Sequence, residues 1–562
     1  MRIVEDQALD VSRLWQRLTL ALMSGAMLGF AFPPSPLASL AYVGLIPFLL
    51  LVETLRTTWQ VLRYSYVMLF VFHALTLYWT GGFTHGNDPW LTASGTALIL
   101  VHPLFYWPPI LLFLFVRRRL GVIAGLASFP FFWIAYEYSH SLGEFSFPWI
   151  TLGNSQAYDI YRIQIAEFTS TYGLSLLLLM FNILGFVLVV KLATAQWSIR
   201  SRNAVVTLLA MMGVYFGPLI FGKILVGRYE AMTNEGALKI GIIQPNIDPW
   251  EKWGKGFSSK WDSYSRQLEM FIAQTESLSR ERPDLIVWPE TAIPFRILLP
   301  QYFSTWTSLR SKLDSINVPV FTGLPFTTYY DSATAPLTAG RIGSSDVFYE
   351  DFNSAALLVP GQPVGPIYKK IVLVPYGERI PYAESFRFLI EPLKWNVGIG
   401  MWGKGTDTVV FALPRPNGRA ILFSTLICYE SVYPNFVRRF TELGAEFLVI
   451  ITNDSWWGNT SGAYQHASYA SLRAVENRRW IVRVANGGIS GFVDPVGRIH
   501  HEKKLFSMAS FVGEIVPRHE LTYYARHGDV FAWASLFCAA LFVILSLFVK
   551  RKGLEKGDDA TT

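Results

Sequence analysis

One cysteine lies where a thiol could act as a nucleophile. Cys428 follows an apolar run of strand-like composition at residues 420–427, and the only other cysteine, Cys538, lies in a C-terminal apolar stretch. A disulfide needs Cα atoms within about 7 Å of each other, which a thiol in a folded domain and one in a membrane helix cannot meet. We therefore predict a free thiol at Cys428. A lone buried cysteine is more often structural than catalytic, so its neighbours decide its role.

Two further motifs place a charged residue beside a strand-like run. Glu290 follows residues 285–288, and Lys370 precedes the apolar residues 371–374. Taken singly, Glu290 is typical of a helix cap or surface charge, and Lys370 of a solvated lysine. In the order Glu, Lys, Cys within one domain they indicate acyl transfer. A carboxylate can take the proton of the thiol, and an ammonium group can stabilise the oxyanion that develops.

The elements that must position these residues are those of an α/β layered domain. Strand-like runs and helical patterns alternate between residues 227 and 525, which is typical of layered α/β folds. This region has no glycine-rich phosphate loop, no zinc-ligand spacing and no basic patch with interleaved aromatic residues. We therefore predict no cofactor, no metal and no nucleic-acid partner.

The composition indicates a membrane portion. Of the 562 residues, 51% are hydrophobic and only 16% are charged, whereas a soluble domain carries about 25% charged residues. A spanning helix needs about 20 mostly apolar residues. On that basis we predict eight spans, at residues 17–33, 39–55, 62–82, 93–116, 120–138, 165–190, 204–226 and 529–549. The predicted domains are a multi-span helical part (1–226), a catalytic α/β part (227–525) and a closing helix with a short tail (526–562).

Lys and Arg at the helix ends predict the orientation. One set of ends carries Arg13, Arg17, Arg56, Arg63, Arg117, Arg118, Arg119, Lys191, Arg200, Arg202, Lys550, Arg551 and Lys552. The alternate loops 34–38 and 83–92 have none, and 139–163 has only Arg162. Both termini are then predicted in the cytoplasm. The catalytic part is predicted on the far side, which is the periplasm in a Gram-negative cell.

Together these motifs resemble the nitrilase superfamily, and more closely the apolipoprotein N-acyltransferases, over nearly the whole chain. The matching segments are FAFPP at 30–34, FPW at 147–149, IIQPNI at 242–247, WPET at 288–291, LVPYGE at 373–378, ICYE at 427–430, NDSWWG at 453–458 and RAVE at 473–476. The resemblance implies a polytopic α-helical membrane domain joined to a periplasmic α-β-β-α sandwich.

The resemblance also implies roles for single residues. Glu290 falls on the family's general base, Lys370 on its catalytic lysine and Cys428 on its nucleophile. The spacing to Glu378 selects Lys370 and not Lys369. The supporting residues that it implies are Glu378, Tyr429, Glu430, Trp253 and Asn353.

Several of these positions have a second interpretation. Glu378 could only neutralise Lys370, and Trp253 could be an aromatic residue of the membrane interface. His466 is expected to be structural, and Glu137 is either functional or a helix-end residue. The apolar segment 382–405 is either core or a mobile arm over a lipid-facing cleft.

The predicted function is transfer of an acyl chain from a phospholipid to the N-terminal amine of a diacylglyceryl-cysteine apolipoprotein, through a thioester on Cys428. The predicted location is the bacterial inner membrane, and a monomer is expected. A membrane-tethered amidase that uses water as the acceptor is the alternative. A transporter or receptor whose soluble domain only binds ligand is a third class, but it has no need of the three catalytic motifs.

Overall fold

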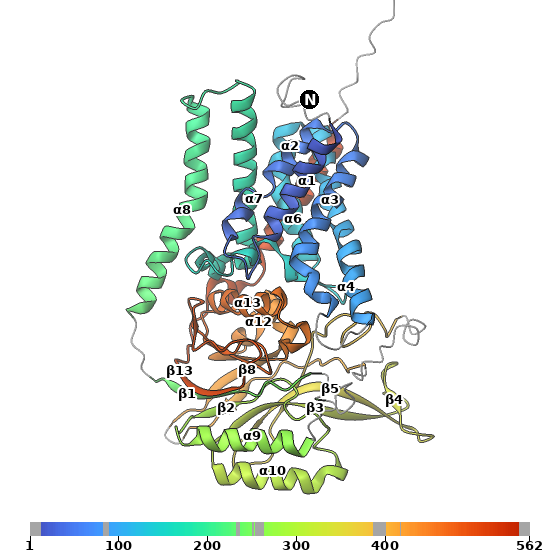
Figure 1. The fold of residues 1–562 in the computed structure, drawn as a ribbon, viewed down its shortest axis with the longest axis vertical. Helices are drawn as coiled ribbons and strands as arrows, with labels where there is room; N and C mark the ends of the chain where they lie inside the picture. The colour runs from blue at the N-terminus through green and yellow to red at the C-terminus, as the bar shows by residue number, and fades with distance from the viewer. Residues whose placement is uncertain are drawn as a thin grey trace, which may run out of the picture.

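The structure is a computed structural model that describes residues 13–82, 89–231, 236–249, 252, 264–385, 401–415 and 418–549. A bundle of helices occupies one end of the molecule and an α/β sandwich the other (Figure 1). Helices α12 (Pro434–Glu442) and α13 (Ser461–Asn477) lie between the bundle and the sheets.

The bundle consists of nine apolar helices that differ in length, from 9 residues in α2 to 29 in α8, among the described residues. They are α1 (Leu14–Gly29), α2 (Ile46–Thr54), α3 (Thr58–Leu77), α4 (Pro89–Val101), α5 (Trp107–Leu120), α6 (Val122–Ser139), α7 (Ala166–Ala193), α8 (Arg202–Glu230) and α15 (Val530–Phe548). Helix α3 begins with a capping box, because Thr57 Oγ1 accepts from Gln60 N at 3.2 Å and Gln60 Oε1 accepts from Thr57 N at 3.2 Å.

Among the described residues, five helical stretches are long and apolar enough to cross a membrane. They are Thr58–Gly81, Thr92–Leu120, Arg162–Ala193, Arg202–Glu230 and Val530–Phe548. Helices α1, α2 and α6 correspond to the other three predicted spans but are not among these five. Helix α1 has 16 residues and α2 only 9, which is short of a full crossing.

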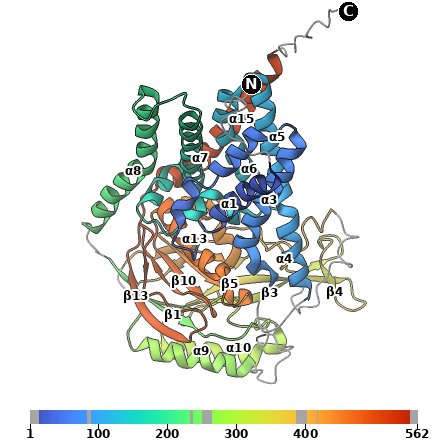
Figure 2. The ribbon, with the colours of Figure 1, turned by 45° about the horizontal axis from the view of Figure 1, so that its top comes forward.

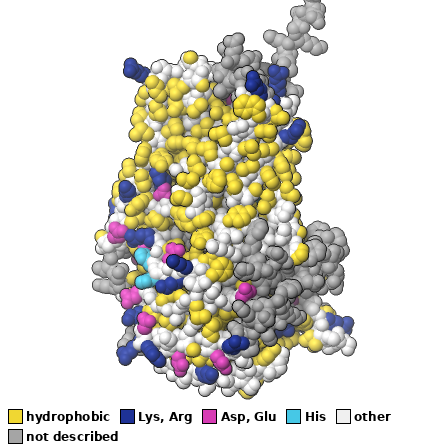
Figure 3. Space-filling model, viewed as in Figure 1, with side chains coloured by type: hydrophobic (Ala, Val, Ile, Leu, Met, Phe, Trp, Pro, Cys, Tyr) yellow, Lys and Arg dark blue, Asp and Glu magenta, His cyan; other side chains and the backbone are white. Residues whose placement is uncertain are grey.

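The face of the bundle seen in Figure 3 is largely apolar. Figure 3 shows a broad band of hydrophobic side chains, with Lys and Arg at the edge farthest from the sandwich. At that end, Arg117 pairs with the buried Glu53 at 2.7 Å, and Arg119 Nη1 donates to the Val549 carbonyl at 3.4 Å. The end of α15 therefore lies beside the end of α5, at the same end as the start of α1 (Figure 2).

Two mixed sheets form the sandwich. The first has the order β13-β1-β2-β3-β5-β4, with β6 also on β5, and the second β12-β11-β10-β9-β8-β7. The first sheet contains β1 (Leu238–Gln244), β2 (Leu285–Val287), β3 (Val320–Asp331), β4 (Gly340–Arg341), β5 (Val347–Leu358), β6 (Ile367–Lys369) and β13 (Ala509–Ile515). The second contains β7 (Phe411–Leu413), β8 (Ile421–Ile427), β9 (Phe447–Thr452), β10 (Ile481–Ala485), β11 (Gly491–Val493) and β12 (Ile499–His500).

The sheets face each other, and helices cover their outer sides. One core contains Ile240 and Phe321 from the first sheet together with Phe423, Ile451 and Val482 from the second. Helices α9 (Tyr264–Ser279) and α10 (Phe303–Ile316) cover the first sheet, and α12 and α13 cover the second (Figure 1). The predicted α-β-β-α sandwich is confirmed.

The sandwich is packed directly against the bundle. Tyr429, Tyr433 and Leu472 belong to the same apolar core as the membrane helices. In α13, a side chain at Gly462 would place its Cβ 2.5 Å from the Trp79 ring, so the close approach requires glycine. Helix α8 runs on to Glu230, past the predicted domain edge at residue 226. Helix α14 (Tyr523–His527) contains the predicted edge at residue 525.

Candidate active site

Three charged side chains meet at one end of the first sheet. Glu290 lies in the turn after β2, Lys370 directly follows β6, and Glu378 lies in the next loop. Lys370 Nζ donates to Glu378 Oε1 at 2.8 Å and lies 3.6 Å from Glu290 Oε1. Lys370 is only 1% exposed and Glu290 7%. The structure therefore brings together the predicted base, the lysine and the supporting carboxylate.

Asn353 in β5 holds both carboxylates. Its Nδ2 donates to Glu290 Oε1 at 2.7 Å and to Glu378 Oε1 at 3.1 Å. Its backbone carbonyl accepts from Lys370 N at 2.8 Å, so the residue is fixed relative to the lysine by the pairing of β5 with β6. Asn353 lies within the cluster, in contact with all three charged residues.

Burial and charge set the protonation states of this cluster. Burial alone would lower the pKa of Lys370, but the charges of Glu378 and Glu290 outweigh it and raise the pKa above its ordinary value. Burial raises the pKa of Glu290 against the opposing charge of Lys370. A lysine that keeps its proton supplies fixed positive charge. A carboxylate with a raised pKa is a stronger base.

Cys428 comes from the facing sheet. It directly follows β8 and begins the short 3-10 helix η9 (Cys428–Val432), with a φ of 54°. This left-handed backbone costs a non-glycine residue about 1–2 kcal/mol. A sharp turn between strand and helix presents a nucleophile at the end of a sheet in other enzymes.

The surroundings of Cys428 keep its proton in place at rest. Burial raises the pKa of the thiol, the charge of Glu290 raises it further, and Lys370 opposes both. The charges of Glu290 and Lys370 thus act on the pKa of the thiol in opposite directions. The thiol needs a base to become a nucleophile, and burial raises the pKa of the predicted base, Glu290.

Glu430 joins the two halves of the site. Its Oε1 accepts from Tyr368 Oη and Ile371 N, both at 2.7 Å, and its Oε2 accepts from Ile427 N at 2.7 Å. Tyr368 and Ile371 flank the lysine segment, and Ile427 precedes the nucleophile. Burial raises the pKa of Glu430 to about 7, although Lys370 and these donors act to lower it. Glu430 thus ties the strand of Lys370 to that of Cys428.

Tyr429 faces the membrane helices. Its hydroxyl donates to the Ser146 carbonyl at 3.1 Å, and its ring stacks near Phe147 and Trp149. Ser146 belongs to the loop that follows α6. The residue after Cys428 is therefore held by the helical bundle.

Glu137 anchors the same loop from inside the bundle. Its Oε1 accepts from Leu152 N at 2.7 Å and from Trp133 Nε1 at 2.9 Å, and its Oε2 accepts from Ser175 Oγ at 2.7 Å. These three contacts support a structural role in holding the loop that carries Trp149.

Lys252 is a site residue that sequence reasoning missed. Its ammonium group donates to the Glu290 carbonyl at 2.9 Å and to Thr291 Oγ1 at 2.8 Å, and the residue is 1% exposed. Burial lowers its pKa to about 7, with Glu290 opposing. A lysine in a stretch of charged and aromatic residues looks like a surface residue, so the sequence carried no signal for this contact.

Two predicted features lie wholly or partly outside the described residues. Trp253 is one, and residues 386–400 of the apolar segment 382–405 are the other. The described flanks of that segment both contact the membrane domain. Glu144 accepts from Tyr382 N and from Lys404 Nζ, the latter at 3.1 Å.

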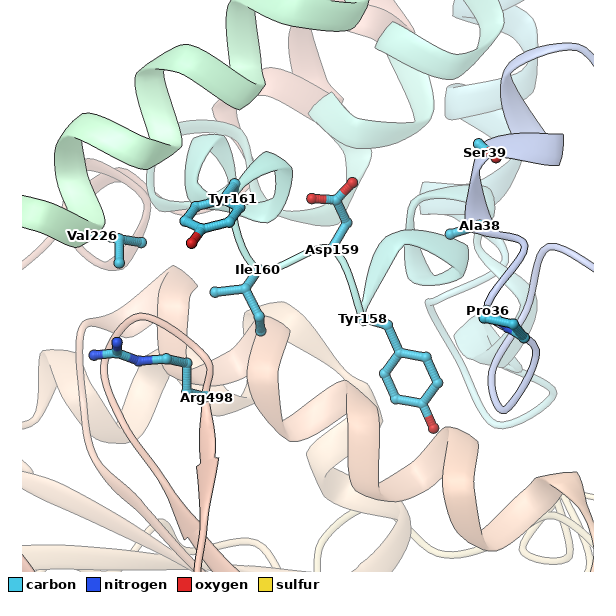
Figure 4. A pocket seen from close by; sticks show the side chains of 9 residues that line it. All are labelled: Pro36, Ala38, Ser39, Tyr158, Asp159, Ile160, Tyr161, Val226 and Arg498. Carbon is cyan, nitrogen blue, oxygen red and sulfur yellow. The ribbon is translucent and has the colours of Figure 1, made fainter.

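A pocket of about 450 Å³ lies elsewhere, between the loops of the bundle and the turn that carries Arg498 (Figure 4). It is lined by Pro36, Ala38, Ser39, Tyr158, Asp159, Ile160, Tyr161, Val226 and Arg498. None of the predicted site residues lines it. Its one lining guanidinium already pairs with Asp494 and Glu230. The pocket is therefore separate from the predicted Glu290–Lys370–Cys428 site.

A facing-sheet sandwich with a Glu, Lys and Cys cluster, packed on apolar helices, defines a membrane-embedded member of the carbon–nitrogen hydrolase class. Residues 239–515 match the family described as carbon-nitrogen hydrolase, and residues 24–184 match the apolipoprotein N-acyltransferase N-terminal domain.

Curated relatives match nearly the whole chain. The apolipoprotein N-acyltransferase of Chlorobaculum tepidum is 33% identical over 95% of this chain and 97% of its own length. That of Geobacter metallireducens is 32% identical over 95% of this chain and 96% of its own length. A solved amidase from Nesterenkonia sp. AN1 aligns with 53% of this chain and 97% of its own at 15% identity, with a TM-score of only 0.35. The chain belongs to the apolipoprotein N-acyltransferase family, and it is an acyltransferase.

Proposed function

We propose that this enzyme transfers an acyl chain from a phospholipid to the N-terminal amine of diacylglyceryl-cysteine apolipoproteins, and that Cys428 carries the chain as a thioester. The names of the curated relatives support lipoprotein N-acylation. The observation that carries the covalent route is the buried Glu290–Lys370 pair, which Glu430 connects to the turn of Cys428 by accepting from both Ile371 N and Ile427 N.

In the first step, the sulfur of Cys428 attacks the ester carbonyl while Glu290 takes the thiol proton. Lys370 stabilises the resulting oxyanion, because the raised pKa keeps it an ammonium ion. The C–O bond of the ester then breaks, and the leaving alkoxide takes the proton from Glu290 to give a lysophospholipid. The products are an acyl thioester on Cys428 and an unchanged base.

In the second step, the amine of the acceptor attacks the thioester carbonyl. Glu290 takes a proton from the amine, the C–S bond breaks, and the sulfur leaves and regains a proton. The two steps consume and release no net proton. A thioester is well suited to this role because it is activated toward an amine.

The packing of the site on the membrane helices supports lipid substrates. Tyr429, next to the nucleophile, contacts the loop after α6, and the following residues join the core of the bundle. The charged cluster thus lies on the side of the sandwich that meets the apolar helices. One chain supplies every group of the proposed mechanism, which agrees with a monomer.

The test is to incubate the purified full chain with phospholipid alone and to search for an acyl adduct on Cys428 by mass spectrometry. We expect the adduct in the wild type and none in Cys428→Ala. Adding a diacylglyceryl-cysteine peptide should then clear the adduct and yield an N-acylated peptide. Release of free fatty acid at the same rate with and without the peptide would instead identify an amidase-like hydrolase that uses water.

We also propose that the sandwich lies in the periplasm and both termini in the cytoplasm. The alternation of Lys and Arg between helix ends supports this. A reporter that is active only in the periplasm should work when inserted at the exposed Ser345, and should fail when fused after Thr562. The opposite pattern would reverse the topology.

A further inference from the structure

The backbone carbonyl of Cys428 is within hydrogen-bond distance of the buried side chain of His466. His466 Nε2 lies 3.1 Å from the Cys428 carbonyl oxygen, and Ser431 Oγ donates to the same oxygen at 2.9 Å. His466 and Ser431 are only 1% and 2% exposed. His466 is in α13 and lies 38 residues from Cys428 in the chain, so only the fold brings them together.

The imidazole of His466 is itself fixed on its other side. Its Nδ1 lies 2.8 Å from Asp454 Oδ1, and Asp454 Oδ2 accepts from Arg483 Nη2 at 2.7 Å. Burial alone would raise the pKa of Asp454, but the charge of Arg483 and the contacts with His466 outweigh it and lower the pKa. Nδ1 thus lies between Asp454 Oδ1 and Arg483 Nη2, the latter at 3.1 Å, and Nε2 faces Ser431 Oγ and the Cys428 carbonyl, so the ring has one orientation.

We propose that His466 is a positioning residue for the nucleophile, an inference that rests on the proposed covalent role of Cys428. A non-glycine residue in a left-handed conformation persists only where its surroundings hold it there. Cys428 has this conformation, with φ at 54°, and its carbonyl is the group on which His466 and Ser431 converge. Holding that carbonyl fixes the turn and thereby directs the sulfur toward Glu290 and Lys370.

The same contacts contain a Ser431–His466–Asp454 series that resembles a serine-hydrolase triad. Ser431 Oγ lies 2.9 Å from His466 Nε2. Ser431 Oγ, however, also bonds to the Cys428 carbonyl at 2.9 Å, and the residue is only 2% exposed. A second nucleophile would need access to substrate, so the series acts on Cys428 and not in its place.

Helix α13 connects this support to the membrane domain. Gln465 Oε1, next to His466, accepts from Trp149 Nε1 at 2.7 Å and from Trp79 Nε1 at 3.1 Å. About two turns further along α13, Arg473 Nη1 donates to the Val432 carbonyl at the end of η9 at 2.8 Å. Helix α13 thus contacts the turn of Cys428 on one side and is hydrogen-bonded to Trp79 and Trp149 of the bundle on the other.

The experiment compares His466→Leu, His466→Gln and Ser431→Ala in the full chain, with Ser468→Ala as the matched control. Ser468 is equally buried in α13, but its hydroxyl only donates to the Gln465 carbonyl of its own helix. Three quantities are measured: kcat and KM for acyl loading of Cys428 from phospholipid, the rate of Cys428 alkylation by a small maleimide resolved by peptide mass spectrometry, and the Tm.

We expect His466→Leu to lower kcat for loading by about 10²-fold, the loss that a displaced reacting atom can cause. KM should stay unchanged because His466 lies behind the nucleophile. Glutamine can place a donor near the position of Nε2, so His466→Gln should recover to within about tenfold of the wild type, the worth of one hydrogen bond. Ser431→Ala should also lower kcat for acyl loading by about tenfold. Ser468→Ala should match the wild type.

A wild-type kcat in folded His466→Leu would overturn the proposal. So would a Gln variant no better than Leu, or a lower Tm with unchanged kcat per folded enzyme, since these show a purely structural role. If His466→Leu does not fold, the values of kcat for His466→Gln and Ser431→Ala test the proposal in its place. If the wild type never acquires an acyl chain but His466→Leu still slows alkylation of Cys428, the proposed function fails and the positioning role stands.

Discussion

Helices α9 and α13 occupy matching outer layers of the sandwich, but they are buried very differently. Helix α9 buries one stripe, which includes Leu268, Phe271 and Leu278. Every residue of α13 except Tyr464 is buried, although its sequence is no more apolar. The difference arises because the bundle covers the outer side of α13, whereas α9 lies on the far side of the molecule (Figure 1).

The burial of α13 requires hydrogen-bond partners for its polar side chains. Gln465, His466, Arg473 and Glu476 are all buried in α13, and a buried polar side chain is costly unless it is bonded. Each bonds either to the nucleophile turn or to the bundle. The two halves of the site also differ in whether the bundle contacts them. The Glu290 and Lys370 half is built within the sandwich, and the Cys428 half is joined to the membrane domain.

The largest change in the rate of acyl loading is expected when the Glu290 and Lys370 half of the site loses the positive charge of Lys370. Lys370→Ala should lower the loading rate by about 10²–10³-fold, because the oxyanion loses its positive partner and Glu378 and Glu290 lose theirs. Lys369→Ala is the matched control, since Lys369 bonds only to Thr328 Oγ1 at 2.9 Å and lies over the Phe352 ring. Loading of Cys428 by mass spectrometry measures both. Equal losses would mean that the assignment of Lys370 is wrong.

The next effect tests the connection of α13 to the bundle. Glu476 Oε1 accepts from Ser170 Oγ at 2.8 Å, and its Oε2 pairs with Arg473 Nε at 2.7 Å. Glu476→Gln should destabilise the protein by about 3 kcal/mol, because it leaves the Arg473 charge buried and unpaired. Glu276→Gln, on the exposed face of α9, should change stability by less than about 0.5 kcal/mol. Thermal unfolding in detergent measures both variants. Comparable shifts in Tm would show that α9 and α13 do not differ in how their polar side chains contribute to stability.

A smaller effect is expected at the residue that joins the halves. In Glu430→Gln the amide oxygen can still accept from Tyr368 and Ile371, but the NH₂ group replaces the acceptor for Ile427 N. We expect loading to slow by about tenfold, the worth of one hydrogen bond. Glu430→Ala, which removes every acceptor, should lose more. If Gln and Ala behave alike in loading assays, the connection to Ile427 carries the whole effect.

The smallest effect is a shift in pH dependence. Below the pKa of Glu290 the base keeps its proton, so loading should fall as the pH falls through that value. The hydrogen bond from Asn353 lowers the pKa of Glu290. Asn353→Leu should therefore raise it and move the acid limb of the rate profile upward by about 0.7 pH, which corresponds to about 1 kcal/mol. A uniform loss of rate at every pH, with an unmoved limb, would restrict Asn353 to a structural role.

The sequence by itself determined the local features. It predicted strand ends at Glu290, Lys370 and Cys428 because apolar runs and the residues that end them are neighbours in the chain. It predicted a membrane array because spanning length is a property of one continuous stretch. It predicted eight spans, and five described stretches meet the length and composition of a crossing. Helix α1 ends at Gly29, before the predicted end at residue 33, and α2 begins at Ile46, after the predicted start at residue 39.

Only the tertiary structure decided which distant groups touch. Nothing local indicates that Asn353 holds Glu290, which lies 63 residues away, or that His466 reaches the Cys428 carbonyl. Such contacts depend on the strand register within each sheet and on how the sheets face each other. They also depend on the bundle that covers α13. His466 was expected to be structural, but the sequence did not indicate that it contacts the Cys428 carbonyl, nor that Lys252 contacts Glu290, because the burial of both side chains depends on elements distant in the chain.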